Sequence, residues 1–136
     1  MPVKGLDEFS KNIRDYAKKV VPAEFAIFHR VISLNAARLL IQMTPKDTGR
    51  ASGNWQTTIN ETPEGVVDDI NLSDKEAAGK EALEKANQTL KTLQPFQTVL
   101  ITNNISYIEF LEKGSSTLAP NGMIEGTIQT LNTIFP

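Results

Sequence analysis

Residues 44–55 read TPKDTGRASGNW and join two segments that have different hydrophobic periods. Over residues 25–43, apolar side chains recur every three or four positions, which is typical of a helix that faces a core. Over residues 54–60, apolar and polar side chains alternate, which predicts a strand. Pro45 disfavours helical angles at the residue before it, and Gly49 permits a positive φ. The sequence therefore predicts a long helix, a tight corner and a strand in direct succession.

The segment before the long helix carries a helical pattern of its own. Ile13, Tyr16 and Val20 stand at helical spacing within residues 10–21 and predict a first helix. Pro22 suits the first turn of a helix and not its interior, so we expect a break here and a new helix after it, with a kink as the alternative. We interpret residues 1–21 as a mobile N-terminal arm on a single domain that comprises residues 1–136.

Further elements are predicted after the first strand. They are a short strand over 66–70, a helix from the S-x-x-E capping box at Ser73 to Leu93, a strand over 97–103, a short helix over 107–114 closed by Gly114, and a helix over 123–134. Together they predict an α+β fold. We expect a small, mostly antiparallel sheet, packed by the long N-terminal helix and the C-terminal helix, with an additional exposed helix between the strands.

Composition and charge narrow the classes of function. The 136 residues include no cysteine and one histidine, so we expect neither a metal nor a cofactor. No apolar run approaches the ~18 residues that span a bilayer, and the N-terminus lacks the apolar core of a secretory signal. Residues 1–50 carry nine Lys/Arg and five Asp/Glu, whereas residues 51–136 carry five and eleven. One positive and one negative half suit head-to-tail contacts between copies of the chain.

A second stretch is as specific as the first. Residues 101–116 read ITNNISYIEFLEKGSS, and residues 119–123 follow as APNGM. With residues 44–55, they resemble the tail-component proteins of tailed bacteriophages, of the tail-completion or neck type that includes minor tail protein Z of lambda-like phages. In that family a T-P-x-D-T-G-R-x-x-x-x-W segment precedes an N-N-x-x-Y-x-x-x-L-E-x-G-x-S segment and A-P-x-G-M. Both signatures stand here in that order.

The resemblance implies a virion protein of the head–tail region, present in the host cytoplasm during assembly, that is needed to join tails to DNA-filled heads. It implies a non-enzymatic, homo-oligomeric ring of six-fold symmetry that contacts other neck and tail proteins and passing DNA, but no membrane. The motif residues are the candidate interface or structural-corner residues: Asp47, Thr48, Gly49, Arg50, Trp55, Asn103, Tyr107, Glu112, Gly114, Pro120 and Gly122.

Residue chemistry leaves the role of Arg50 open. Its planar group of donors suits an anchor on a neighbouring subunit, or a clamp inside the subunit on Asp47, Glu109 or Glu112, and we favour the clamp. Trp55 is expected to pack in the core rather than to form a binding platform. Asn103 and Tyr107 are expected to cap free backbone groups.

Two other classes of function have weaker support in the sequence. Glu109 and Glu112 lie three residues apart, as paired catalytic carboxylates can, but no nucleophile, phosphate-binding or metalloprotease motif accompanies them. Lys11, Arg14 and Lys18 form a basic stripe, which we interpret as a solvated helix face rather than a phosphate contact. The alternatives to tail completion are therefore a head-side connector or stopper, and a nonspecific DNA-binding accessory protein.

Overall fold

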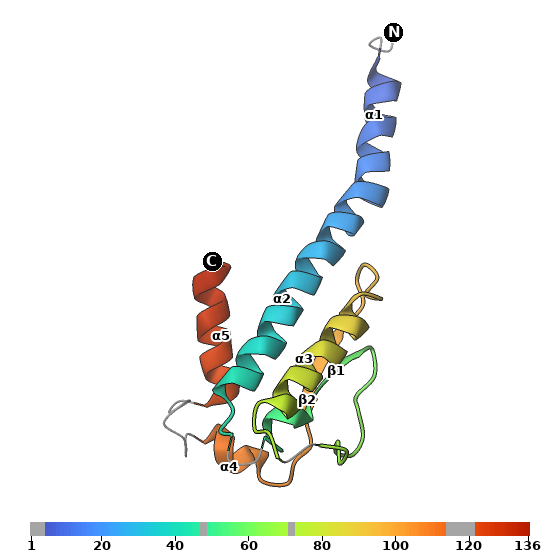
Figure 1. Ribbon diagram of the computed structural model, residues 1–136. Helices are drawn as coiled ribbons and strands as arrows, with labels where there is room; N and C mark the ends of the chain where they lie inside the picture. Colours follow the sequence, from blue (N-terminus) through green and yellow to red (C-terminus); the bar gives the residue numbers. More distant parts are fainter. Residues whose placement is uncertain (1–4, 47–48, 71–72, 114–121) are drawn as a thin grey trace.

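One helix runs from Leu6 to Met43 in the computed structural model, which describes residues 5–46, 49–70, 73–113 and 122–136 (Figure 1). It consists of α1 (Leu6–Asp15), a π-helical segment η1 (Tyr16–Val20) and α2 (Val21–Met43). The second half of α2 lies within the body of the protein, whereas α1 projects away from it (Figure 1). No residue of α1 or η1 is buried, so residues 6–20 form an exposed arm.

The predicted break at Pro22 is wrong, because the helix continues through the proline. Proline lacks an N–H to donate, and in a regular α-helix its ring crowds the carbonyl four residues back. The turn before Pro22 is widened instead: the Val21 N–H donates to the Tyr16 carbonyl, five residues back, which is the π-helical pattern. Pro22 then stands at the second residue of α2, directly after this widened turn.

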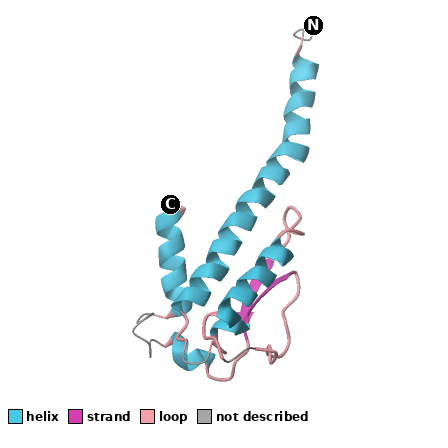
Figure 2. Ribbon diagram, viewed as in Figure 1, coloured by secondary structure: helices cyan, strands magenta, loops and turns pink. Residues whose placement is uncertain are grey.

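The sheet consists of two antiparallel strands, β1 (Trp55–Ile59) and β2 (Val99–Asn103) (Figure 2). Trp55 lies opposite Asn103, and Ile59 lies opposite Val99. Both strands were predicted from their alternation or apolar content. The strand predicted over 66–70 is wrong, since these residues have no regular secondary structure.

Between the strands, α3 (Ala77–Leu90) packs against both α2 and β1. Small residues allow close approach on both sides of α3: a Cβ on Gly79 would lie 2.8 Å from Ile41 Cγ2, and one on Gly53, in the short 3-10 turn before β1, would lie 2.7 Å from Ala78 Cβ. The capping box predicted at Ser73 does not start the helix, which begins at Ala77 without a side-chain cap. The helix between the strands is confirmed, and its inner face is part of the core.

Two further helices, α4 (Ile108–Glu112) and α5 (Met123–Ile134), close the fold. The bounds of α5 are those predicted, and it packs along α2 (Figure 1). The core cluster combines residues from four elements: Leu40, Ile41, Trp55, Ala82 and Met123. The predicted α+β fold is therefore confirmed, with the core between α2, α3, α5 and the sheet.

Candidate functional site

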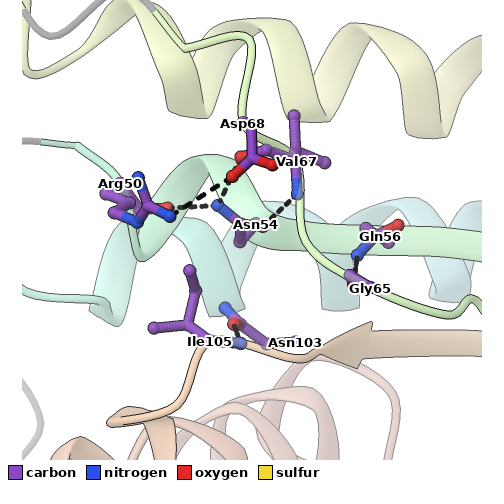
Figure 3. A network of polar contacts seen from close by, with 8 residues as sticks. All are labelled: Arg50, Asn54, Gln56, Gly65, Val67, Asp68, Asn103 and Ile105. Carbon is purple, nitrogen blue, oxygen red and sulfur yellow. Dashed lines mark hydrogen bonds and ion pairs between the residues drawn. The ribbon is translucent and has the colours of Figure 1, made fainter.

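The two signature stretches of the sequence meet at one end of the body. Asn103, at the end of β2, donates from Nδ2 to the carbonyl of Ala51, over 2.9 Å. Its Oδ1 accepts the Ile105 N–H over 3.1 Å, as Figure 3 shows. Asn103 thus caps backbone groups as predicted, and it joins residues 49–55 to residues 103–113 in one site.

The corner before β1 is built around Gly49, which is buried and has a φ of 84°. Its carbonyl accepts the Gly53 N–H over 2.9 Å and the Ser52 hydroxyl over 3.1 Å. A Cβ at this position would lie 2.6 Å from the Lys75 carbonyl oxygen. Glycine is therefore required here both for the left-handed backbone and for the close approach of the segment before α3.

Thr44 and Trp55 form a buried polar contact across the corner. Trp55 is 4% exposed, and its Nε1 donates to Thr44 Oγ1 over 2.8 Å. That hydroxyl in turn donates to the Leu40 carbonyl over 2.6 Å and lies 3.2 Å from Met123 Sδ. The expectation that Trp55 packs in the core is confirmed. The role of Thr44 was not predicted, because only the tertiary fold brings the indole to it.

Asn54 fastens the loop over residues 61–70 to the corner (Figure 3). It is fully buried; its Oδ1 accepts the Val67 N–H over 2.6 Å, and its Nδ2 donates to the Arg50 carbonyl over 2.8 Å. Gln56 adds a bond from Nε2 to the Gly65 carbonyl over 3.1 Å. The backbone of this loop therefore bonds to side chains rather than to the backbone of β1, which explains why the strand predicted over 66–70 does not form.

Arg50 is paired inside the subunit, as we favoured, but with a residue that was not considered. Its Nη2 lies 3.4 Å from Asp68 Oδ1, on the same loop that Asn54 holds (Figure 3). The two side chains are 39% and 78% exposed. Such an exposed pair contributes at most about 1 kcal/mol to the free energy of unfolding. The buried side chains of Asn54 and Thr44 therefore contribute more to the stability of the corner.

Glu112 caps the start of α5 from the end of α4. Its two carboxylate oxygens lie 2.9 and 3.1 Å from the Ile124 nitrogen, whose N–H they accept. The carboxylate thus meets the positive end of the α5 dipole. Gly122, with a φ of 101°, makes room for this contact, since a Cβ there would lie 2.6 Å from the Glu112 carbonyl oxygen. Both candidate residues are therefore placed together by the fold.

A hollow of about 280 Å³ lies between β2, α4 and α5. Its apolar lining includes Trp55, Ile101 and Met123, and its acidic lining is Glu109 and Glu112. Such a surface suits a side chain with an apolar stem and a cationic end. Glu109 and Glu112 share this hollow, but the Glu112 carboxylate is engaged by α5.

The remaining predicted residues are more dispersed. Tyr107 is exposed at the start of α4, and its side chain makes no capping hydrogen bond there, so the capping role predicted for it is wrong. Asp47, Thr48, Gly114 and Pro120 lie outside the described residues. The residues that sequence reasoning missed are Thr44, Asn54 and Asp68. Only Asn54 carried a local signal, because asparagine often bonds to backbone groups in turns.

The described ranges contain no cluster of three or more His, Asp or Glu side chains that could hold a metal ion. Within the same ranges, none of the helices combines the length and the apolar character needed to cross a membrane. Comparison of the chain with protein-family models, with curated proteins and with solved structures found no significant match.

Proposed function

We propose that this chain is a structural protein of the head–tail region of a tailed-bacteriophage virion, of the tail-completion type. It acts through protein–protein contacts, as a subunit of a homo-oligomeric ring that makes tails competent to join DNA-filled heads. The observation that carries the proposal is the contact between the two motif stretches. They lie far apart in the sequence, yet Asn103 bonds directly to Ala51 and pairs with Trp55. The resemblance therefore corresponds to one connected site.

The surface beside this site supports a role in binding a protein partner. The hollow between β2, α4 and α5 has an apolar lining and two glutamates; Tyr107, just before α4, and Phe110, within it, are also exposed. In the proposed ring, the basic half of a neighbouring subunit, residues 1–50, contacts the acidic half, residues 51–136, to which this hollow belongs. Contact between unlike surfaces of neighbours is what a closed ring requires.

The test removes the gene from a phage that carries it. We expect DNA-filled heads and finished tails to accumulate as separate particles in electron micrographs, and purified protein added to the lysate to restore joining. Tailed virions formed in normal numbers without the protein would overturn the proposal. Addition of the protein to isolated heads rather than to tails would instead indicate the head-side connector or stopper.

A charge reversal tests the site itself. Glu109 is exposed, so Glu109→Lys should fold normally and yet reduce joining, because it opposes a basic partner. Glu61→Lys makes the same charge change on an exposed loop residue away from the hollow and serves as the matched control. Equal joining by the two variants would remove the hollow from the proposed interface.

Nonspecific binding of DNA is the second candidate, because Lys11, Arg14 and Lys18 all lie on the exposed arm. Backbone contacts of this kind weaken steeply with salt and show no preference for sequence. A filter-binding titration at two salt concentrations measures this directly. Tight, salt-sensitive binding that is lost in Lys11→Gln/Lys18→Gln would favour the second candidate.

A further inference from the structure

The arm carries an apolar face that nothing in the described part of the chain covers. Leu6, Phe9, Ile13, Tyr16 and Val20 recur at alternating intervals of three and four residues. Their exposed fractions range from 38% to 61%. This spacing is the seam of a coiled coil, in which apolar residues at two positions of each heptad pack into a partner helix.

The π-helical segment keeps this face continuous into α2. Val21, Phe25, Phe28 and Ile32 recur at intervals of four, three and four, but this series is offset from the first by one residue. A π turn holds about one residue more than an α turn, so η1 absorbs the offset. Both series therefore lie on the same side of the helix. The widened turn that accommodates Pro22 also aligns the apolar face.

Two aromatic rings mark where the body begins to border this face. The ring of Phe96, in the loop between α3 and β2, stacks 5.5 Å from that of Phe25. The ring of Phe135, after α5, meets Phe28 edge-on at 5.8 Å. The end of α5 and the α3–β2 loop lie on opposite sides of α2 in Figure 1. From this point toward the N-terminus, the face is open.

The extent of the face matches what a stable interface needs. An aromatic side chain accounts for about 150–250 Å² of surface and an aliphatic one for less, so the half-exposed side chains from Leu6 to Phe28 leave on the order of 700 Å² uncovered. A standard interface buries about 800 Å² on each partner. A soluble monomer rarely exposes an apolar patch of more than a few hundred Å².

The borders of the face favour another protein helix with the same pattern. Ser10 and Ala17 flank it on one side and Asn12 on the other. Lys19 and Glu24 stand next to Val20 and Phe25 as Asn12 stands next to Ile13, and long charged side chains at such borders keep their charge in solvent when two arms approach. Lys11 lies two residues from both Phe9 and Ile13, about 200° around the helix, and remains in solvent. An identical heptad seam on each copy is self-complementary.

We propose that the face from Leu6 to Phe28 is a self-association surface, on which the arm of a second copy of this chain packs side by side. The parallel direction of the two arms rests on the proposed function: the copies of a ring are related by rotation about one axis, and arms that meet at that axis through their like faces point the same way. The contact itself depends only on the apolar seam and its exposed area.

Sedimentation of the full chain tests the surface. Wild-type protein should associate in the micromolar range, and raising salt should not weaken that association, because apolar contacts are not screened. Ile13→Glu should raise the concentration for half-association by at least tenfold. Lys11→Gln makes the same change in charge on the opposite side of the arm and should leave that concentration within twofold of wild type. Circular dichroism confirms that each variant keeps its fold, as expected for exposed positions.

Cysteine cross-linking tests the direction, and the natural absence of cysteine makes each introduced thiol unique. A short thiol cross-linker should join Leu6→Cys chains to one another. In a mixture of Leu6→Cys and Val20→Cys chains, a cross-link between the two different variants would indicate antiparallel arms and overturn the parallel arrangement.

Several results would overturn the surface as a contact between copies. One is association that persists unchanged in Ile13→Glu, which would leave the proposed ring standing on other contacts. Another is a wild-type chain that stays monomeric at high concentration. Binding of that monomer to vesicles of anionic lipid would assign the face to a membrane surface, and association only with purified tails would assign it to a different protein. Head–tail joining by such a monomer would keep the proposed function while removing this inference.

Discussion

Replacing Thr44 with valine tests whether the buried hydroxyl holds the corner together. Valine has the shape of threonine without the hydroxyl, so the change removes hydrogen bonds and leaves the packing intact. Trp55 Nε1 loses the acceptor at 2.8 Å, and the Leu40 carbonyl loses the donor at 2.6 Å. A buried polar group left unsatisfied costs about 1–3 kcal/mol, so the two together should cost about 2–6 kcal/mol of unfolding free energy. That is a large part of the roughly 5–15 kcal/mol that stabilises a domain.

The assay is urea unfolding followed by tryptophan fluorescence, because Trp55 is the only tryptophan in the chain. The midpoint should fall without a change in slope, and the emission of the folded state should report the altered surroundings of the indole. Thr44→Ser is the matched control: it keeps the hydroxyl and removes one methyl group, which costs about 1 kcal/mol. A larger loss in Thr44→Ser than in Thr44→Val would refute the reasoning, since methyl packing would then outweigh the hydrogen bonds.

Three further changes probe the same end of the body. Asn54→Ala should cost about 2–3 kcal/mol in urea unfolding, because it leaves the part-buried Arg50 carbonyl and Val67 N–H without their partner, and earlier proteolysis of the 61–70 loop should accompany it. A double-mutant cycle on Arg50→Ala and Asp68→Ala should give a coupling below about 1 kcal/mol, since the pair is exposed; a coupling above 2 kcal/mol would contradict this. Glu112→Gln should lower the thermal midpoint slightly, by the equivalent of about 0.3–1 kcal/mol, because the start of α5 keeps an acceptor but loses a negative charge; no loss even at low salt would argue against the cap.

Only part of the candidate site could be predicted from local features of the sequence. The corner at Gly49 follows from its own backbone requirement, and the placement of Trp55 in the core follows from its size. Sequence reasoning found the capping role of Asn103 because asparagine at a strand end has few alternatives. It did not find Asp68 as a partner of Arg50, because Asp68 lies in a loop whose position is set by Asn54, and Asn54 gave no more than a general turn signal.

Local features of the sequence account for several of the secondary-structure elements. The bounds of α5, the position of β1 and the end of α2 before Pro45 all follow from hydrophobic period and from residues that restrict the backbone. The remaining features depend on contacts between residues that are distant in the sequence, and only the tertiary structure shows them. In the segment over residues 66–70, the Val67 N–H bonds to the Asn54 side chain instead of to a neighbouring strand. The helix continues through Pro22 because one turn before it is widened. The apolar side of the arm is also exposed in the folded chain. Hydrophobic period predicts which side of a helix is apolar, but it does not predict whether the same chain or another copy buries that side.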